Sequence, residues 1–504
     1  MEVRNGIDHP RVREAVLFPF DDHSIPFTIG LRLHLVSGKE ADYSNTIVVP
    51  RGPQGAPDEE TVRFYGTVIP VDDELRMWYL ARGRLDTDTE IFAPGKLDFD
   101  PSIGWVKGAR ELRACYAVSR DGVHWEKPNL GLVEYNGSKE NNIVDLLEGR
   151  CNLSLMPMIY DPEDPDPNRR FKVAFESSRH DFRVSVAYSP DGLRWSESPN
   201  NPVAPLMEQT GLIRFNGCYY VNGQAGGHFG PGRKQLTYAS YDFEHWTVAS
   251  CLGLRRDNIP PRPMPTRSNP GEEVHIGAGL WNRGNVIIGV YDMWHGSASE
   301  DRSQVTMDLG MVVSNDALHY REPIPDFRFM PAYEEVGVPL GCGPALSHGQ
   351  GLFNIGDQTM LCYECWPVTD VRLARWPRDR LGYFRFFGSG VEDFAAGGDA
   401  GQQRHCITCA VHLQGESARV YANVDGVSEH SELTVELLDE QFRPLAGYAG
   451  DACMPLRTPG LRQPVLWKDR DQVAVDGAVR LRVNFGGLRP EDARLYALYI
   501  SEEG

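Results

Sequence analysis

The sequence predicts an all-β protein, a five-bladed β-propeller followed by a C-terminal β-sandwich. Two internal repeats and the alternating strands near the C-terminus carry this prediction. The first repeat is a 14-residue segment whose three copies align without a gap: Gly211–Gln224, Gly279–Asp292 and Gly351–Glu364. Each copy opens Gly-Leu, turns at a central Gly, Asn or Asp, and runs through apolar and aromatic residues to a polar end. This pattern indicates that the same type of β-hairpin occurs three times in the chain.

A turn motif alternates with these hairpins. Its best copies read Ser-x-Asp-Gly-x-x-Trp, and weaker copies follow; they are Ser119–Trp125, Ser189–Trp195, Ser240–Trp246, Ser314–Tyr320 and Arg378–Phe384. The Asp carboxylate can accept backbone N–H bonds inside the turn, Gly takes a positive φ, and the aromatic residue anchors the next strand. Five copies after strand-like runs predict five similar antiparallel sheets, which a β-propeller stacks around an axis.

The expected domain organisation follows from the length of the chain and from a change in its residue pattern near the C-terminus. A chain of 504 residues is too long for one core. We expect a lead-in at residues 1–55 that packs on the propeller, the propeller itself at 56–388, and the sandwich at 389–504. The last boundary falls in a Gly-rich segment, which precedes strand-like runs of alternating apolar and polar residues. Helical periodicity is almost absent.

Composition narrows the classes of partner and compartment. The net charge of −19 argues against nucleic acid or an anionic membrane as partner. The sequence contains no apolar run long enough to span a bilayer. Its N-terminus lacks the apolar region of a signal peptide, so we expect a cytoplasmic protein. Two Cys-x-x-Cys pairs, Cys362/Cys365 and Cys406/Cys409, allow a zinc site as an alternative, but buried free thiols are favoured because i and i+3 point to opposite faces of a strand.

The repeats also predict which residues meet at the mouth of the propeller. The final positions of the aligned hairpins end the second strand of a blade: Gln224, Asp292 and Glu364, with Glu176 in blade two and Arg82 in blade one at equivalent places. The first strand begins three residues before each Gly-Leu: Glu208, Ile276 and His348. This register places four carboxylates on one rim, those of Glu176, Glu208, Asp292 and Glu364.

Converging carboxylates are the arrangement that glycoside hydrolysis requires. One must stay protonated to protonate the leaving oxygen, another must stay ionised as base or nucleophile, and crowding separates their pKa values. Glu208, Asp292 and Glu364 are the candidate catalytic residues, and Asp292 or Glu364 would be the base or nucleophile. The expected substrate-binding side chains are Glu176, Arg82, Arg179, His180, Gln224, His228, Trp294, His348 and Trp366. The two tryptophans would offer stacking faces to sugar rings.

No metal site is assigned, and no cofactor is required by this chemistry. The histidines and one Asp near the rim show no tight ligand spacing; they are His228, His275, His295, His348 and Asp308. A divalent cation at the propeller axis is left open.

The segments SRDGVHWEKP and EQTGLIRFNGCYYVNGQ and the C-terminal sandwich resemble the five-bladed glycoside hydrolases of families 32, 43, 62 and 68. The resemblance implies action on furanosides such as fructosides or arabinosides. In family 43 a general-acid Glu opens the first strand of blade three before a Gly-Tyr-Tyr run, and Glu208 matches that place, followed by Gly217, Tyr219 and Tyr220. The appended sandwich is similar to that of family 32.

This chain departs from the family pattern in its first blade. The strand there reads RFYGTVIPV and holds no acid where both families carry a catalytic Asp, and the Arg-Asp-Pro motif of family 32 is absent. The resemblance therefore leaves the base or nucleophile unassigned.

Two other functions remain open beside a glycosidase. One is a sugar-active lyase, epimerase or transglycosylase on the same propeller, in which histidines and a divalent cation would dominate. The other is a non-catalytic carbohydrate-binding propeller. A carbohydrate is the expected partner in each case, and self-association into a homo-oligomer is left open.

Overall fold

The structure is a computed structural model that describes residues 1–38, 40, 42–83, 99–100, 104–105, 112–149, 153–227, 230–260, 272–295, 306–332, 345–365, 370–387 and 404–502. Strands dominate these residues. The helical elements among them are single 3-10 turns: η1 (Leu147–Gly149), η2 (Pro167–Arg169), η3 (Ser178–His180), η6 (Gly450–Ala452) and η7 (Pro490–Asp492). The predicted all-β class is confirmed. No helix within these ranges has the length and apolarity needed to cross a membrane.

Most of the chain forms five successive antiparallel units, numbered here in chain order. Unit 1 contains β6 (Thr61–Val71), β7 (Glu74–Arg82) and β10 (Arg113–Ser119). Unit 2 contains β11 (Met158–Tyr160), β12 (Phe171–Phe175), β13 (Ser185–Ser189) and β14 (Ser196–Glu197). Unit 3 contains β15 (Glu208–Phe215), β16 (Cys218–Gly227), β17 (Gly230–Ser240) and β18 (Cys251–Leu254). Unit 4 contains β19 (Glu272–Asn282), β20 (Ile287–His295) and β21 (Thr306–Ser314). Unit 5 contains β22 (Leu346–Ile355), β23 (Gln358–Cys365) and β24 (Val371–Pro377). Outside the five units, β8 (Phe99–Asp100) pairs with β9 (Gly104–Trp105).

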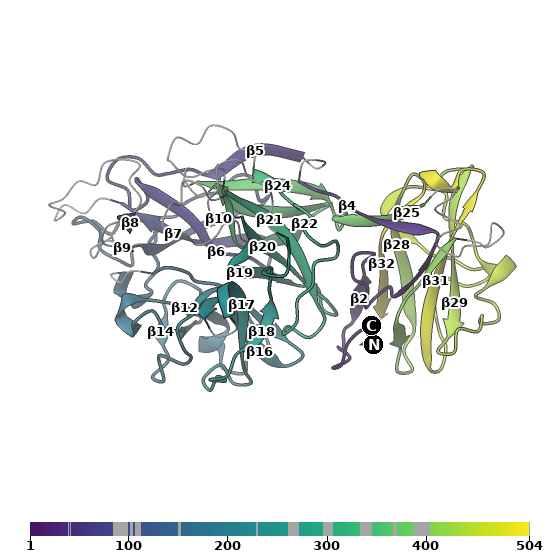
Figure 1. Cartoon of the computed structure of the whole chain (residues 1–504), viewed down its shortest axis with the longest axis horizontal. Helices are drawn as coiled ribbons and strands as arrows, with labels where there is room; N and C mark the ends of the chain where they lie inside the picture. Colours follow the sequence, from purple (N-terminus) through teal and green to yellow (C-terminus); the bar gives the residue numbers. More distant parts are fainter. Residues whose placement is uncertain are drawn as a thin grey trace.

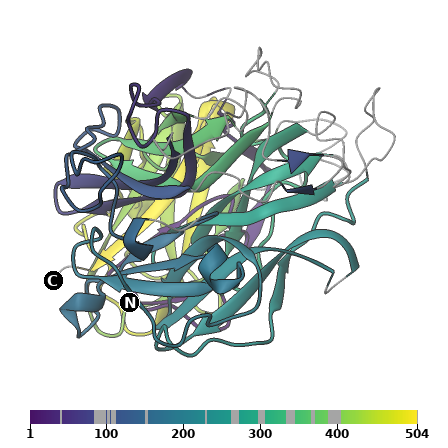
Figure 2. The ribbon, with the colours of Figure 1, turned by 90° about the vertical axis from the view of Figure 1, so that its left-hand side faces the viewer.

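The five units follow one another around a closed cycle (Figure 2). Their first strands contact in the order β6, β11, β15, β19, β22 and back to β6. The last contact is a parallel pairing of Gln350 with Thr67. Glycine permits this close approach, because a Cβ on Gly349 would lie 2.4 Å from the carbonyl oxygen of Gly66. This order of contacts is the one that a five-bladed propeller requires.

Protein hydrogen bonds link the first strands across the ring. The Gln350 side chain is buried; its Oε1 accepts from the Leu212 N–H at 2.6 Å, and its Nε2 donates to the Met158 carbonyl at 2.8 Å. Met158 N–H in turn donates to Thr67 Oγ1 at 2.9 Å. One amide side chain thus ties units 2, 3 and 5 together.

Both sequence repeats take the predicted local structure. The three aligned segments form the hairpins β15–β16, β19–β20 and β22–β23. In the turn motif, Asp121 Oδ1 accepts the N–H groups of Val123 and His124, each at 2.8 Å, and Trp125 Nε1 donates to the Gly122 carbonyl. The carboxylates of Asp191, Asp242 and Asp316 make the same pair of backbone contacts. The fifth copy differs, because Asp379 is buried and binds Arg283 and the Tyr499 hydroxyl.

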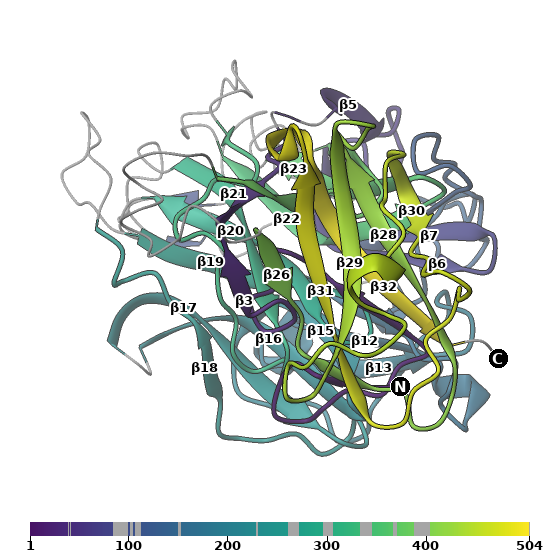
Figure 3. The same ribbon diagram turned by 90° about the vertical axis from the view of Figure 1, so that its right-hand side faces the viewer.

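The C-terminal strands build two six-stranded sheets (Figures 1 and 3). The first contains β1 (Glu2–Arg4), β27 (Ala410–His412), β31 (Ala478–Gly487), β26 (His405–Ile407), β3 (Phe27–Ile29) and β29 (Ser431–Asp439). The second contains β30 (Gly460–Pro464), β28 (Ala418–Asp425), β32 (Arg494–Glu502), β25 (Gly382–Phe386), β4 (Leu31–Leu35) and β2 (Glu14–Leu17). Side chains of both sheets share one hydrophobic cluster, which includes Val420, Leu433, Val483 and Leu498.

The N-terminal lead-in pairs with the C-terminal sheets and also packs on unit 4. Its strands β1 to β4 pair within the two C-terminal sheets, and the N-terminal amine binds Glu502. Asn285 in the β19–β20 turn exchanges two hydrogen bonds with the Val16 backbone, each at 2.8 Å, and Arg321 binds Asp21 and Asp22. From the lead-in, β5 (Asp42–Val49) alone joins the five units, where it pairs with β24. β5 is the outermost strand beside β24, whereas β25, which lies inside the predicted propeller range 56–388, pairs with β4 and β32 of the C-terminal sheets. The domain limits at residues 56, 388 and 389 stay predictions.

Candidate functional site

The four carboxylates that the sequence placed on one rim belong to one connected group of side chains. Glu176 follows β12, Glu208 opens β15, and Asp292 and Glu364 lie on the second strands β20 and β23. Glu176 interacts electrostatically with Glu208, and Asp292 with Glu364. His275 on β19 interacts with one member of each pair. The charge of Glu208 acts on it electrostatically, and its Nδ1 hydrogen-bonds Asp292. We call these five residues the rim cluster.

Glu176 and Glu208 form a pair of carboxyl groups from units 2 and 3. Glu176 is 4% exposed, and burial together with the charge of Glu208 raises the pKa of Glu176 well above its usual value. Glu208 is partly exposed and accepts a hydrogen bond from Gln224 Nε2. The Gln224 amide cannot flip, because its Oε1 accepts the Ile276 N–H at 2.9 Å. Glu176 is therefore the carboxyl group that holds a proton more readily than an ordinary Glu side chain.

Asp292 is fully buried and is surrounded by hydrogen-bond donors. Its Oδ2 accepts from His275 Nδ1 and from Ser347 Oγ, both at 2.7 Å, and its Oδ1 accepts from His348 Nδ1 at 2.6 Å. Burial raises the pKa of Asp292, but its interactions with His348 and His275 outweigh this effect and leave the pKa below its usual value. The Gly279 N–H donates to His348 Nε2 at 3.0 Å, which fixes the His348 proton on Nδ1. Asp292 thus joins unit 4 to unit 5 as an ionised carboxylate.

Glu364 joins unit 5 to unit 1 in a comparable way. It is fully buried; its Oε1 accepts from Arg63 Nη1 at 3.1 Å, and its Oε2 accepts the Phe64 N–H. Burial raises the pKa of Glu364 to about 7; Arg63 and the Phe64 hydrogen bond oppose this rise, and the Asp292 charge adds to it. Arg63 was missed by the sequence reasoning, which looked for an acid in this first strand.

The observed register differs by one residue from the predicted register in two units. Counting back from Gly-Leu indicated Ile276 and His348 as rim positions, whereas the partners of Asp292 and Glu364 are His275 and Ser347. The cause is the size of the β-bulge in the first strand. In unit 3 the pairing steps from Gln209–Gly223 to Gly211–Asn222, which inserts one extra residue. In unit 4 it steps from His275–Asp292 to Ala278–Tyr291, which inserts two.

Trp294 and its neighbour Arg233 adjoin the rim cluster. The Trp294 ring centroid lies 5.0 Å from that of His275, and the Arg233 guanidinium carbon lies 4.3 Å from the Trp294 ring. Trp294 is 1% exposed, which leaves little of the ring for a sugar to stack on. Within the described ranges, Trp294 Nε1 and Arg233 Nη1 have no hydrogen-bond partner.

Other predicted binding residues are not brought to the cluster by any contact among the described residues. Arg179 Nη1 and His180 Nε2 bind the two oxygens of Glu197, at 2.7 and 2.6 Å, on the last strand of unit 2. Arg82 ends β7 with its Nε 3.8 Å from Glu60 Oε2. His228 and Trp366 lie outside the described residues.

The part of the chain that the structure describes offers no group of three or more His, Cys, Asp or Glu side chains arranged for a metal ion. His295, one of the candidate ligands, is instead held between Glu272 and Asp308. The cysteines of the two Cys-x-x-Cys pairs are free thiols that lie in separate hydrophobic clusters: Cys362, Cys365, and Cys406 with Cys409. This separation does not fit one zinc site built from both pairs.

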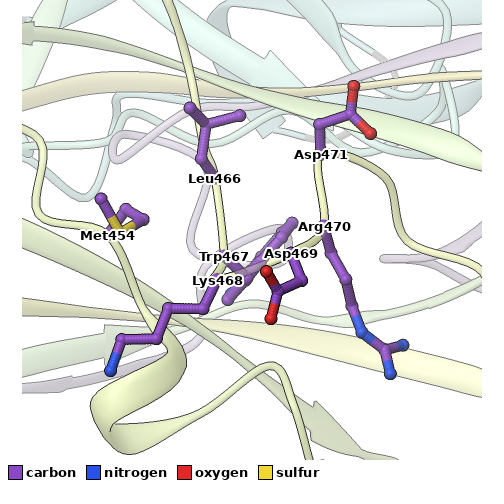
Figure 4. Close-up of a pocket in the computed structure, with 7 residues that line it drawn as sticks. All are labelled: Met454, Leu466, Trp467, Lys468, Asp469, Arg470 and Asp471. Atoms are coloured by element: carbon purple, nitrogen blue, oxygen red, sulfur yellow. The ribbon is translucent and has the colours of Figure 1, made fainter.

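A surface hollow lies elsewhere, on the C-terminal sheets (Figure 4). Its lining residues follow one another closely in sequence: Met454, Leu466, Trp467, Lys468, Asp469, Arg470 and Asp471. None of them belongs to the rim cluster, and the Trp467 side chain is buried beneath the hollow rather than presented to solvent.

No protein-family model matches the sequence, and no curated protein matches it either. Among solved structures, the chain is similar to a glycosyl hydrolase from Bacteroides ovatus (15% identity, 69% of this chain and 94% of that chain, TM-score 0.41). It is also similar to a β-1,2-mannobiose phosphorylase from Listeria innocua (13%, 69% and 97%, TM-score 0.42). A third is a family 43 arabinoxylan arabinofuranohydrolase from Bacillus subtilis (10%, 91% and 99%, TM-score 0.37). These similarities are distant, and the function proposed below rests on the rim cluster.

Proposed function

We propose that this protein is a glycosidase that cleaves the glycosidic bond of a small glycoside or oligosaccharide by acid–base catalysis. A single observation carries the proposal: Glu176 and Glu208 are interacting carboxyl groups of adjacent units, and burial together with the Glu208 charge raises the pKa of Glu176. The sequence resemblance favours a furanoside such as a fructoside or arabinoside. The cytoplasm is the expected compartment.

Glu208 is the proposed general acid. It is the more exposed member of the pair, and Gln224 holds one of its oxygens in place. Glu176 is the buried member and supplies the raised proton affinity. In the reaction Glu208 donates its carboxyl proton to the leaving oxygen as the bond to the anomeric carbon breaks. A positioned acid of this kind contributes about 10²–10⁴-fold in rate.

The contacts favour positioning roles for Asp292 and Glu364, which the sequence offered as base or nucleophile. Every carboxylate oxygen of both residues already accepts a hydrogen bond from a neighbouring unit. Neither side chain has measurable exposure. A nucleophile needs an oxygen that can reach the anomeric carbon, and the base of an inverting enzyme needs room for a water molecule.

The test is a screen of aryl furanosides, aryl pyranosides and furanosyl oligosaccharides with the wild type, Glu208→Gln and Glu176→Gln. Glu208→Gln is expected to lower kcat by about 10²–10⁴-fold on substrates with a poor leaving group and much less on dinitrophenyl glycosides, which need no acid. Glu197→Gln, on the outer strand of unit 2, is the matched control and is expected to keep full activity. Unchanged turnover by Glu208→Gln would remove the assignment. Binding of oligosaccharides without turnover by the wild type would favour the non-catalytic alternative.

One observation favours a second candidate, a sugar-active lyase or epimerase. His275 hydrogen-bonds the buried Asp292 through Nδ1, which is how proton-abstracting histidines are oriented. Such an enzyme would exchange a carbon-bound proton of the sugar with solvent. Incorporation of deuterium from heavy water into a carbon position of product or recovered substrate would support this candidate over a glycosidase.

A further inference from the structure

His275 has a ring orientation fixed by its surroundings. Its Nδ1 lies 2.7 Å from Asp292 Oδ2, and the same oxygen accepts the Ser347 hydroxyl. An ionised carboxylate can only accept hydrogen bonds, so Nδ1 must carry the ring proton. The lone pair of a neutral His275 is then on Nε2.

Asp292 cannot turn away from this contact. Its other oxygen accepts from His348 Nδ1, and the Gly279 backbone N–H fixes that tautomer from the far side of the His348 ring. Ser347 and His348 both come from β22, so unit 5 holds the carboxylate of unit 4 in place. Rigid support of this kind is what a proton-transfer group needs, since misplacement of a reacting atom by about 1 Å costs about 10²-fold in rate.

His275 differs from the other buried histidines of the described residues in how its ring nitrogens are used. His348 binds Asp292 and the Gly279 N–H, and His295 binds Glu272 and Asp308, so each of these rings uses both nitrogens. In the described contacts of His275, Nδ1 is bonded and Nε2 has no partner. The side chain keeps 9% of its surface exposed.

The charged groups that act on His275 come from three neighbouring strands. Asp292 lies on β20, Glu208 on β15 and Arg233 on β17, while the ring of Trp294 packs beside it. Burial lowers the pKa of His275; the Asp292 hydrogen bond and charge raise it, the Arg233 charge lowers it and Glu208 raises it, and the balance stays below the usual value. A neutral imidazole near pH 7 is able to accept a proton.

We propose that His275 is the general base of the rim cluster and that it activates the water that attacks the anomeric carbon. Asp292, Ser347 and His348 act through His275 as positioning residues. This inference rests on the proposed glycosidase function and completes it, because the carboxylates that the sequence offered as base have no free oxygen.

The proposed reaction is a single displacement at the anomeric carbon. His275 Nε2 takes a proton from water as the water oxygen bonds the anomeric carbon and the glycosidic carbon–oxygen bond breaks. The carboxyl proton of Glu208 goes to the leaving oxygen. The products are a free sugar with inverted anomeric configuration and an alcohol. His275 then releases its proton to solvent, and Glu208 takes one up.

The experiment uses the full chain and the best aryl glycoside from the screen. His275→Gln is expected to lower kcat by about 10²–10⁴-fold, to remove the acidic limb of the pH profile of kcat/KM, and to regain rate when azide is added as a nucleophile. His319→Gln is the control, because His319 is exposed and binds Asp316 within a turn. Proton NMR of the first product is expected to show anomeric inversion. Retention, or a wild-type acidic limb in His275→Gln, would overturn the inference.

Failure of this inference and failure of the proposed function give different results. Unchanged turnover in Glu208→Gln and Glu176→Gln would remove the glycosidase site as a whole. Loss of turnover in those variants with a wild-type pH profile in His275→Gln would remove the base alone. Should His275→Gln not fold, ¹⁵N-histidine NMR of the wild type decides the point. A proton on Nδ1 and a lone pair on Nε2 at neutral pH support the base, and the opposite tautomer or a charged ring would overturn it.

Discussion

Two pairs of acids occupy neighbouring parts of the same ring, and the protein treats them in opposite ways. Asp292 and Glu364 are fully buried, and each of their oxygens accepts a hydrogen bond from a group on the next unit. Glu176 and Glu208 also come from adjacent units, but they interact as two acids, and burial together with the Glu208 charge raises the pKa of Glu176. The first pair joins units through hydrogen-bond donors, whereas the second pair brings two carboxyl groups together.

This difference shows that the burial of an acid does not by itself mark a catalytic group. A buried carboxylate is costly unless donors compensate it, so most buried carboxylates are compensated. The informative feature is the acid whose partner is another acid. In this ring that feature lies between units 2 and 3, and the compensated acids lie between units 4, 5 and 1.

The largest expected effect separates the two pairs by stability. Asp292→Ala leaves the Nδ1–H groups of His275 and His348 without an acceptor in a buried site, and we expect it to lower the free energy of unfolding by about 3–5 kcal/mol. Glu208→Ala removes a repulsive partner of Glu176 and is expected to leave that free energy unchanged or raise it. Urea unfolding followed by tryptophan fluorescence measures both. Equal destabilisation by the two substitutions would contradict the distinction.

A second prediction concerns Glu364 and pH. Its pKa is raised from 4.5 to about 7 in the folded protein, so between these values the folded state binds more protons than the unfolded state. Stability from this group is therefore present below the unfolded pKa and is lost as pH rises through the folded pKa, by about 3 kcal/mol in total. Glu364→Gln cannot titrate, and we expect its free energy of unfolding to fall less between acidic and neutral pH. An unchanged pH dependence would show that the carboxylate is already ionised when folded.

Much of the ring was predictable because its repeats are local. The Asn-Gly turn of β15–β16 and the Ser-x-Asp-Gly turns are encoded in a few adjacent residues, so both were found in sequence. The sequence also assigned Asp292 and Glu364 to second strands, and they lie on β20 and β23, which continue to His295 and Cys365. The rim positions on two of the first strands were not predicted correctly, because a β-bulge of one or two extra residues cannot be recognised in the repeated sequence. His275 and Ser347 were not predicted as rim positions for this reason.

The roles of the acids were not predictable for a different physical reason. Whether Glu364 is free or compensated depends on Arg63 and on the Phe64 N–H, which are about 300 residues away in sequence and meet it where unit 5 joins unit 1. The placement of β5 beside β24 depends on the same closure of the chain. Contacts between residues so far apart in sequence leave no repeating pattern of residue types from which they could be predicted.

The smallest expected effect tests how much each donor contributes to the Asp292 site. Ser347 Oγ donates to Asp292 Oδ2 at 2.7 Å from a fully buried position. Removing one hydrogen bond to a charged group lowers stability by about 1.5–3 kcal/mol, and the two histidines remain as donors, so we expect Ser347→Ala to lie near the lower value. The same substitution in an Asp292→Asn background is expected to cost less, because the acceptor is no longer charged. A double-mutant cycle measures this coupling, and strict additivity would show that Ser347 does not act through Asp292.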